Sequence, residues 1–118
     1  MIYKKLMLFI ALGMAIVSGH VNAEASKSFK EICGKTTATL QEGILISKYY
    51  SDTNTDHKGV FFVDSEGTTW QLPSALNYPD NILTPEQRKI AMAAFLTAMK
   101  VNVCAKNKVV WSIELDNE

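Results

Sequence analysis

The sequence contains few of the side chains on which enzymes and metalloproteins rely. Its 118 residues include two histidines and two cysteines, and one of those histidines, His20, falls in a leader that we expect to be removed. His57 and a pair of bridged cysteines do not make up the usual zinc site. No G-x-S-x-G, phosphate-loop or H-E-x-x-H motif occurs, and the acidic residues are scattered. We therefore expect no catalytic residue, no metal and no cofactor.

The chain also lacks a net charge, because 12 Lys and Arg residues balance 12 Asp and Glu residues. Removing Lys4 and Lys5 with the leader leaves 10 basic residues against 12 acidic ones. A chain of this balance has no positive field with which to hold nucleic acid or anionic lipid. We therefore expect no nucleic acid as a partner.

Long unbroken apolar runs are absent except near the N-terminus, where "LMLFIALGMAIV" follows Lys4 and Lys5. The run has the length of a signal-peptide core, and "VNA" places small residues before a cleavage point between Ala23 and Glu24. An uncleaved anchor is the alternative, which the adjoining cleavage motif disfavours. We predict a signal peptide at 1–23 and one secreted domain at 24–118, with no transmembrane segment after cleavage.

Both cysteines, Cys33 and Cys104, lie in the predicted mature chain. In an exported protein, two cysteines most simply form one disulfide. Two reactive thiols are the alternative, but neither cysteine has a C-x-x-C or catalytic signature around it. We expect a bridge that ties the start of the domain to its C-terminal part.

The remaining pattern predicts a small β-barrel of the OB kind with a short N-terminal helix and one long helix. Gly43 is expected to divide or kink the first strand segment. Trp70 and Trp111 are expected in the core. The short helix is expected at 26–33, with Ser26 or Ser28 as its cap and with Phe29, Ile32 and Cys33 on one side. The long helix is expected at 84–100. Strands are expected within 36–51, 59–72, 101–104 and 109–115.

The segment "TPEQRKIAMAAFLTAMK" (84–100) begins with the signature of a capped helix, in which Thr84 is the cap, Pro85 the first helical residue and Gln87 the end of a capping box. It then becomes apolar on almost every side, unlike a surface helix. The run is too short to span a bilayer, and the domain is too small to surround it. We therefore expect other protein chains to cover its second side.

Thr36 and Thr37 follow Cys33, and the expected disulfide would hold their backbone in place. Threonine hydroxyls donate and accept hydrogen bonds, which suits sugar hydroxyls and carboxylates. Two adjacent threonines are also common at the start of a strand. From these residues alone, that structural interpretation is favoured over a binding site.

Several motifs, in order, resemble the B subunit of the type II heat-labile enterotoxins, relatives of the cholera toxin family. The resemblance runs from about Phe29 to Leu115 and is carried by "CGKTTATLQEG", "YPDN", "RKIAMAA", "VNVCA" and "VVWSIEL". It implies an OB-fold protomer in a homopentamer that binds host-cell gangliosides. It also implies a catalytic, ADP-ribosylating A subunit held through the central pore.

The resemblance further implies that helix 84–100 lines the pore and forms the interface between copies. The residues assigned to that interface are Arg88, Ala91, Met92, Ala94, Phe95 and Met99. The small alanines would allow neighbouring helices to approach closely. This arrangement would explain an apolar helix that one barrel alone does not cover.

The family's sugar-binding threonines correspond to Thr36 and Thr37. A third family threonine corresponds to His57, whose larger, titratable side chain is expected to alter the choice of ganglioside, with Asp56 and Lys58 as rim contacts. The alternative function is a secreted OB-fold module that binds an oligosaccharide or a protein without an A partner. A neighbouring reading frame for an ADP-ribosyltransferase would distinguish the two.

Overall fold

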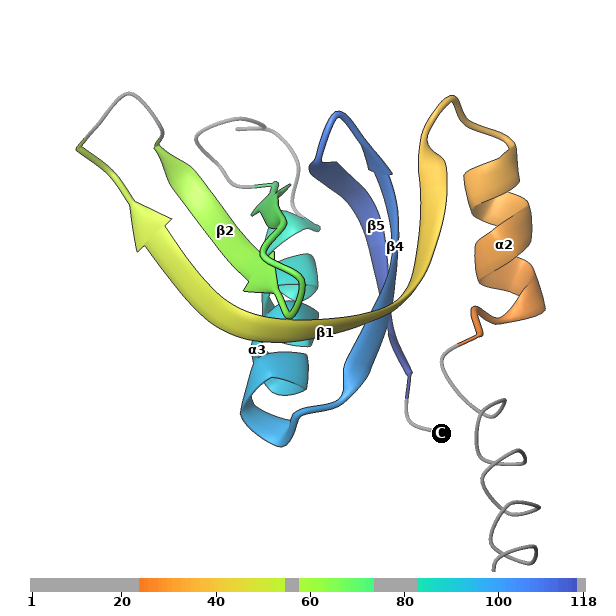
Figure 1. Ribbon diagram of the computed structural model, residues 1–118. Coiled ribbons are helices and arrows are strands. Elements are labelled where there is room, and N and C mark those ends of the chain that lie inside the picture. Colours follow the sequence, from red (N-terminus) through yellow and green to blue (C-terminus); the bar gives the residue numbers. More distant parts are fainter. Residues whose placement is uncertain (1–23, 55–57, 74–82, 117–118) are drawn as a thin grey trace, which may run out of the picture.

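The computed structural model describes residues 24–54, 58–73 and 83–116, which form a five-stranded closed barrel with two helices (Figure 1). The strand order around the barrel is β1-β2-β3-β5-β4, and only β3 and β5 are parallel neighbours. The closed sheet with two helices confirms that part of the predicted architecture; the predicted signal peptide lies outside the described residues. The elements are α2 (Lys27–Gly34), β1 (Thr39–Asp52), β2 (Gly59–Asp64), β3 (Thr69–Leu72), α3 (Thr84–Thr97), β4 (Lys100–Lys106) and β5 (Val109–Asp116).

Strand β1 is one strand of 14 residues that curves through the whole molecule, so Gly43 kinks it and does not divide it (Figure 1). Its first half pairs with β4 and its second half with β2, with an irregular register between Gln41 and Ile44. Gly43 has φ +73°, a conformation that residues with a Cβ rarely adopt. Its N–H donates to the buried Asn102 Oδ1 at 3.0 Å, which satisfies a donor that the kink removes from the ladder.

The core fills the barrel and the space under α3. Trp70 lies in it as expected, whereas Trp111 is 41% exposed, so the prediction that Trp111 is a core residue is wrong. The register between β4 and β5 shifts so that Trp111 is an extra residue between Val110 and Ser112, which turns it outward. The buried core residues are Ile44, Ile46, Phe62, Trp70, Leu72, Ala91, Ala94, Val101, Val103, Ala105, Val110 and Ile113.

Helix α2 begins as predicted and packs less than predicted. Ser26 is its N-cap, and the Ser26 side chain accepts from the Phe29 N–H at 3.2 Å. Cys33 is buried and bonded to Cys104, which confirms the predicted disulfide. Ile32 remains 56% exposed, so the expected apolar side of this helix is not fully packed against the barrel.

Both ends of α3 differ from the predicted ends. No side chain caps its N-terminus at Leu83, and Thr84 is already inside the helix, so the predicted capping box is wrong. Gln87 instead donates its side-chain amide to the Trp111 carbonyl at 3.0 Å, which ties the helix to β5. The helix ends at Thr97, because Ala98 adopts a left-handed conformation with φ 59°. Across the described ranges, no helix is long and apolar enough to cross a bilayer.

Candidate functional site

The segment that joins α2 to β1 is fixed by the disulfide and by the Thr36 hydroxyl. Cys33 lies in the last turn of α2, where its side chain is buried. Its disulfide bond to Cys104 attaches this segment to β4 across a sequence separation of 71 residues. The Thr36 hydroxyl donates to the Cys33 carbonyl at 2.7 Å and accepts from the Ala38 N–H at 3.0 Å. Because its one hydrogen is used inside the chain, Thr36 shapes the segment and retains only acceptor capacity toward a ligand.

Thr37 is exposed, and its hydroxyl is held by a lysine that sequence reasoning missed. The Lys106 ammonium donates to Thr37 Oγ1 at 3.0 Å, and both residues are exposed. Lys106 is the last residue of β4, directly after the pair that Ala105 forms with Thr39 of β1. The Thr37 hydroxyl therefore keeps its hydrogen for a ligand, beside a positive charge.

Of the loop residues predicted for the glycan site, Asp56, His57 and Lys58, the structure describes only Lys58. Lys58 is exposed and directly precedes β2, whereas Asp56 and His57 lie outside the described residues. In Figure 1 the ends of β1 and β2 that flank this loop lie on the left, and the junction of α2 with β1 lies on the right. Within one copy of the chain, the end of β2 that follows Lys58 therefore lies apart from the junction of α2 with β1.

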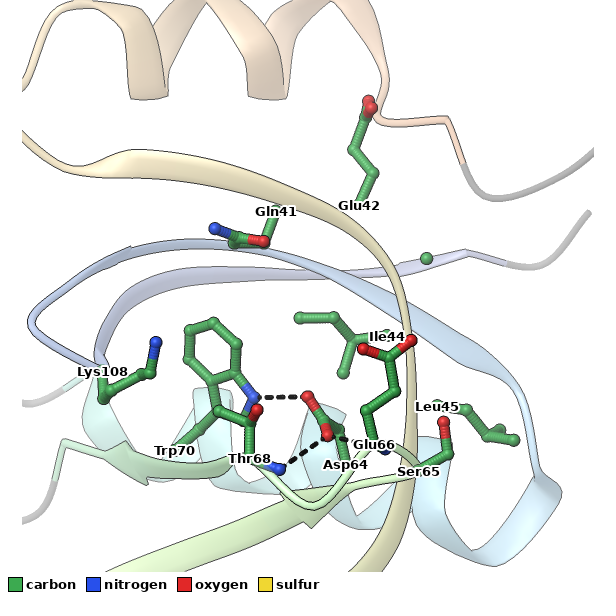
Figure 2. A pocket seen from close by; sticks show the side chains of 11 residues that line it. Gln41, Glu42, Ile44, Leu45, Asp64, Ser65, Glu66, Thr68, Trp70 and Lys108 are labelled. Atoms are coloured by element: carbon green, nitrogen blue, oxygen red, sulfur yellow. Dashed lines mark hydrogen bonds between the residues drawn. The ribbon is translucent and has the colours of Figure 1, made fainter.

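A cavity of about 200 Å³ lies between the first half of β1 and the turn that joins β2 to β3. Figure 2 shows Asp64 directed toward this space beside Trp70. Asp64 Oδ1 accepts from the Glu66 and Thr68 N–H groups, each at 2.9 Å. Its Oδ2 accepts from the Trp70 indole N–H at 3.0 Å. These bonds hold the turn on the barrel and account for a carboxylate that is 9% exposed.

Hydrogen bonds and a nearby positive charge stabilise the ionised form of Asp64. Burial acts to raise its pKa, but the bond from Trp70, the two backbone bonds and the charge of Lys108 together lower the pKa below its ordinary value. The Lys108 ammonium lies 5.3 Å from the centre of the Trp70 ring, within the range of a cation–π contact. Sequence reasoning missed Asp64, which is the last residue of β2 and begins the turn to β3.

Helix α3 presents two different sides. Ala91 and Ala94 are fully buried in the core of the chain itself, so their side chains are not available to a neighbouring copy. Met92 is 39% exposed, Phe95 36% and Leu96 71%. We call these three residues the apolar face of α3; Leu96 was not among the residues predicted for the interface.

Arg88 and Phe95, both predicted for the interface, contact the chain itself. Arg88 donates from Nη1 to the Pro73 carbonyl at 3.2 Å, and its own carbonyl accepts from the Tyr49 hydroxyl at 3.2 Å. The Tyr49 ring stacks on Phe95 with centroids 6.3 Å apart. Burial raises the pKa of Tyr49 against the opposing charge of Arg88. Met99 is half-buried just after the helix end.

The whole chain, residues 1–118, matches the family model of the type II heat-labile enterotoxin B subunit. It is 44% identical over 122 residues to the heat-labile enterotoxin IIB B chain of Escherichia coli, covering 100% of both chains. It is 42% identical over 119 residues to the IIA B chain of the same species, covering 98% of this chain and 97% of that one. The chain therefore belongs to the family of type II heat-labile enterotoxin B subunits.

Solved structures share the fold at lower identity. The cholera toxin-like B subunit of Citrobacter freundii matches with TM-score 0.58 and 21% identity, covering 77% of this chain and 99% of that chain. The GM1-bound form of the ECX AB5 holotoxin matches with TM-score 0.63 and 18% identity, covering 80% and 100%. The porcine E. coli heat-labile enterotoxin B-pentamer, in complex with lacto-N-neohexaose, matches with TM-score 0.63 and 16% identity, covering 79% and 100%.

Proposed function

We propose that this chain is the ganglioside-binding B subunit of a secreted toxin and that it is a binding subunit without catalytic activity. The observation that carries the proposal is the match to type II B chains over the entire sequence, at 44% identity to one of them. The fold neighbours add that B subunits of this shape bind glycans, because one is solved with GM1 and another with lacto-N-neohexaose. The barrel is accordingly proposed to be an OB-fold.

The proposed assembly is a homopentamer whose pore is lined by α3. The apolar face of α3 supports this, because Met92, Phe95 and Leu96 expose a contiguous apolar surface at helical spacing. Covering that surface with other copies would remove it from water, which stabilises an assembly in proportion to the area buried. A ring of this kind would carry one A subunit through its centre, and the ADP-ribosylating activity would belong to that A subunit.

The proposed glycan site contains Thr36 and Thr37 as its fixed part. Thr37 offers a free hydroxyl hydrogen and Thr36 an acceptor, on a backbone that the disulfide holds. Lys58 directly precedes β2, and this end of β2 lies apart from the junction of α2 with β1 within one chain (Figure 1). We therefore propose that in the ring Asp56, His57 and Lys58 contribute to the same glycan site from a neighbouring copy.

The test is binding of the purified, oxidised mature protein to phosphatidylcholine vesicles that contain a mixed ganglioside fraction. We expect the protein to float with ganglioside vesicles and to remain in solution with phosphatidylcholine alone. A Thr37→Val variant, which keeps the shape and loses the hydroxyl, should stay in solution with both while still forming a ring. Equal behaviour of the wild type with both kinds of vesicle would contradict the proposed function.

A further inference from the structure

We propose that Lys106, acting together with the Thr37 hydroxyl, is the residue that binds the carboxylate of the acidic sugar of a ganglioside. The inference rests on the proposed function, because it adds a specificity-determining residue to the same glycan site. Lys106 is 69 residues from Thr37 in the sequence, so only the folded chain indicates that the two act together.

The geometry of the pair suits a carboxylate. A lysine ammonium has three hydrogens, and Lys106 uses one of them on Thr37 Oγ1 at 3.0 Å. The Thr37 hydroxyl accepts that bond and still has its own hydrogen to donate. The two groups therefore present donors side by side on an exposed surface, and a carboxylate has two oxygens able to accept from both.

The charges around the pair also favour an anion. No acidic residue occurs between Gly34 and Gln41 or between Val103 and Ile113, the two stretches that meet here, whereas they contain three lysines, at 35, 106 and 108. The ion pairs of Lys30 with Glu24 and of Lys89 with Glu86 lie elsewhere in the described ranges and do not involve Lys106. A local excess of positive charge thus lies in a chain whose formal net charge is zero.

The disulfide holds both members of the pair. Thr37 is four residues after Cys33, and Lys106 is two residues after Cys104, so the same covalent bond fixes the backbone on each side. The Thr36 hydroxyl lies 3.8 Å from Cys104 Sγ, which places the three elements of the site against one another. A site that is held before the ligand arrives loses less conformational entropy on binding.

The experiment uses three soluble probes that differ only at the acidic sugar: ganglioside oligosaccharides, the same oligosaccharides with their carboxylates reduced to alcohols, and the same oligosaccharides after removal of sialic acid. Five proteins are compared as oxidised rings, namely the wild type, Thr37→Val, Lys106→Met, Lys106→Arg and Lys27→Met. Lys27 lies at the other end of α2, is exposed and provides the matched loss of one charge. Native mass spectrometry and thermal unfolding verify that each variant assembles and folds.

We expect the wild type to bind the acidic oligosaccharides about tenfold more tightly than the carboxyl-reduced ones, the ratio expected for one charge-assisted hydrogen bond. Lys106→Met should bind both with the weaker affinity, whereas Lys106→Arg and Lys27→Met should keep the preference. If Lys106→Met keeps the full preference while Thr37→Val binds all three probes more weakly than the wild type, the role of Lys106 is wrong and the glycan site stands. If the wild type binds none of the probes, the proposed function fails as well.

Discussion

The disulfide-held pair of Thr37 and Lys106 and the apolar face of α3 differ in what a single chain supplies to each. The polar groups of the pair are already joined by a hydrogen bond at 3.0 Å. The apolar face contains Leu96, which is 71% exposed, although this face belongs to the same helix that buries Ala91 and Ala94 completely. The pair therefore forms within one copy of the chain, whereas the apolar face of α3 remains exposed in one copy. Tests that damage one surface and spare the other therefore examine the account directly.

The largest expected effect is on the disulfide that underlies the polar surface. Replacing Cys33 and Cys104 together by serine removes a cross-link between residues 71 apart, which costs about 4 kcal/mol of stability in the chain-entropy model. We expect little folded protein to accumulate, as measured by denaturant unfolding and by the yield of ring. Free thiols at both positions in active wild-type protein, detected by mass spectrometry, would show that this expectation is mistaken.

The next effect separates the two sides of α3. Ala94→Glu places a carboxylate in the core and should destabilise the protomer by about 3 kcal/mol or more, because nothing there pairs with it. Leu96→Glu changes an exposed side chain and should alter the free energy of unfolding of one chain by only about 0.5 kcal/mol. The second variant should nevertheless lower the fraction of ring measured by light scattering. Equal loss of fold in both variants would remove the distinction between the two sides.

A smaller effect concerns Asp64, which lies outside both surfaces. Asp64→Asn leaves one acceptor oxygen in place of two for the two backbone N–H groups and the indole N–H that bond to it. We expect it to lower the free energy of unfolding by about 2 kcal/mol. The pKa of Asp64 is lowered from 3.8, so its charge stabilises the fold fully above the pKa of the unfolded chain, and this contribution is lost as the pH falls through the lower pKa of the folded chain. Unfolding measured from pH 6 to 2 should therefore converge for wild type and variant at the acidic end. Parallel curves over this range would exclude the role given to the carboxylate.

The smallest effect distinguishes the two threonines of the polar surface. Thr37→Val removes a hydroxyl whose hydrogen is free, so we expect about a tenfold loss of affinity per site for ganglioside oligosaccharides at unchanged stability. Thr36→Val removes a hydroxyl that bonds the Cys33 carbonyl, so it should lower thermal stability as well. Calorimetric binding and thermal unfolding of both variants measure the difference. Identical losses in the two variants would contradict the separate roles.

The strands, the disulfide and the long helix could be predicted because each depends on local pattern or on composition. The ends of α3 could not be predicted in this way. Ala98 adopts a left-handed conformation that ends the helix shortly before β4, and the Gln87 side chain donates to the Trp111 carbonyl. Local capping preferences were overridden by these tertiary contacts. Trp111 was misplaced because the shift in register between β4 and β5 decides which way it points, and spacing within one strand does not reveal such a shift.

The candidate site was predictable only through resemblance. Thr36 and Thr37 look like an ordinary strand start, and their different hydrogen bonds appear only in the folded chain. Lys106 is 69 residues from Thr37, so no spacing rule connects them. The two alanines predicted for the interface are core residues, since the 3.6-residue period places them on the side of α3 that faces the barrel.

The most direct test of the account is the mass of the oxidised mature protein measured by native mass spectrometry at micromolar concentration. Five copies in one ring would cover the apolar face of α3 and align five polar sites for multivalent binding. We predict a pentamer in the wild type and a shift toward monomer in Leu96→Glu. A stable wild-type monomer that still binds ganglioside vesicles as tightly as the proposed ring would contradict the account.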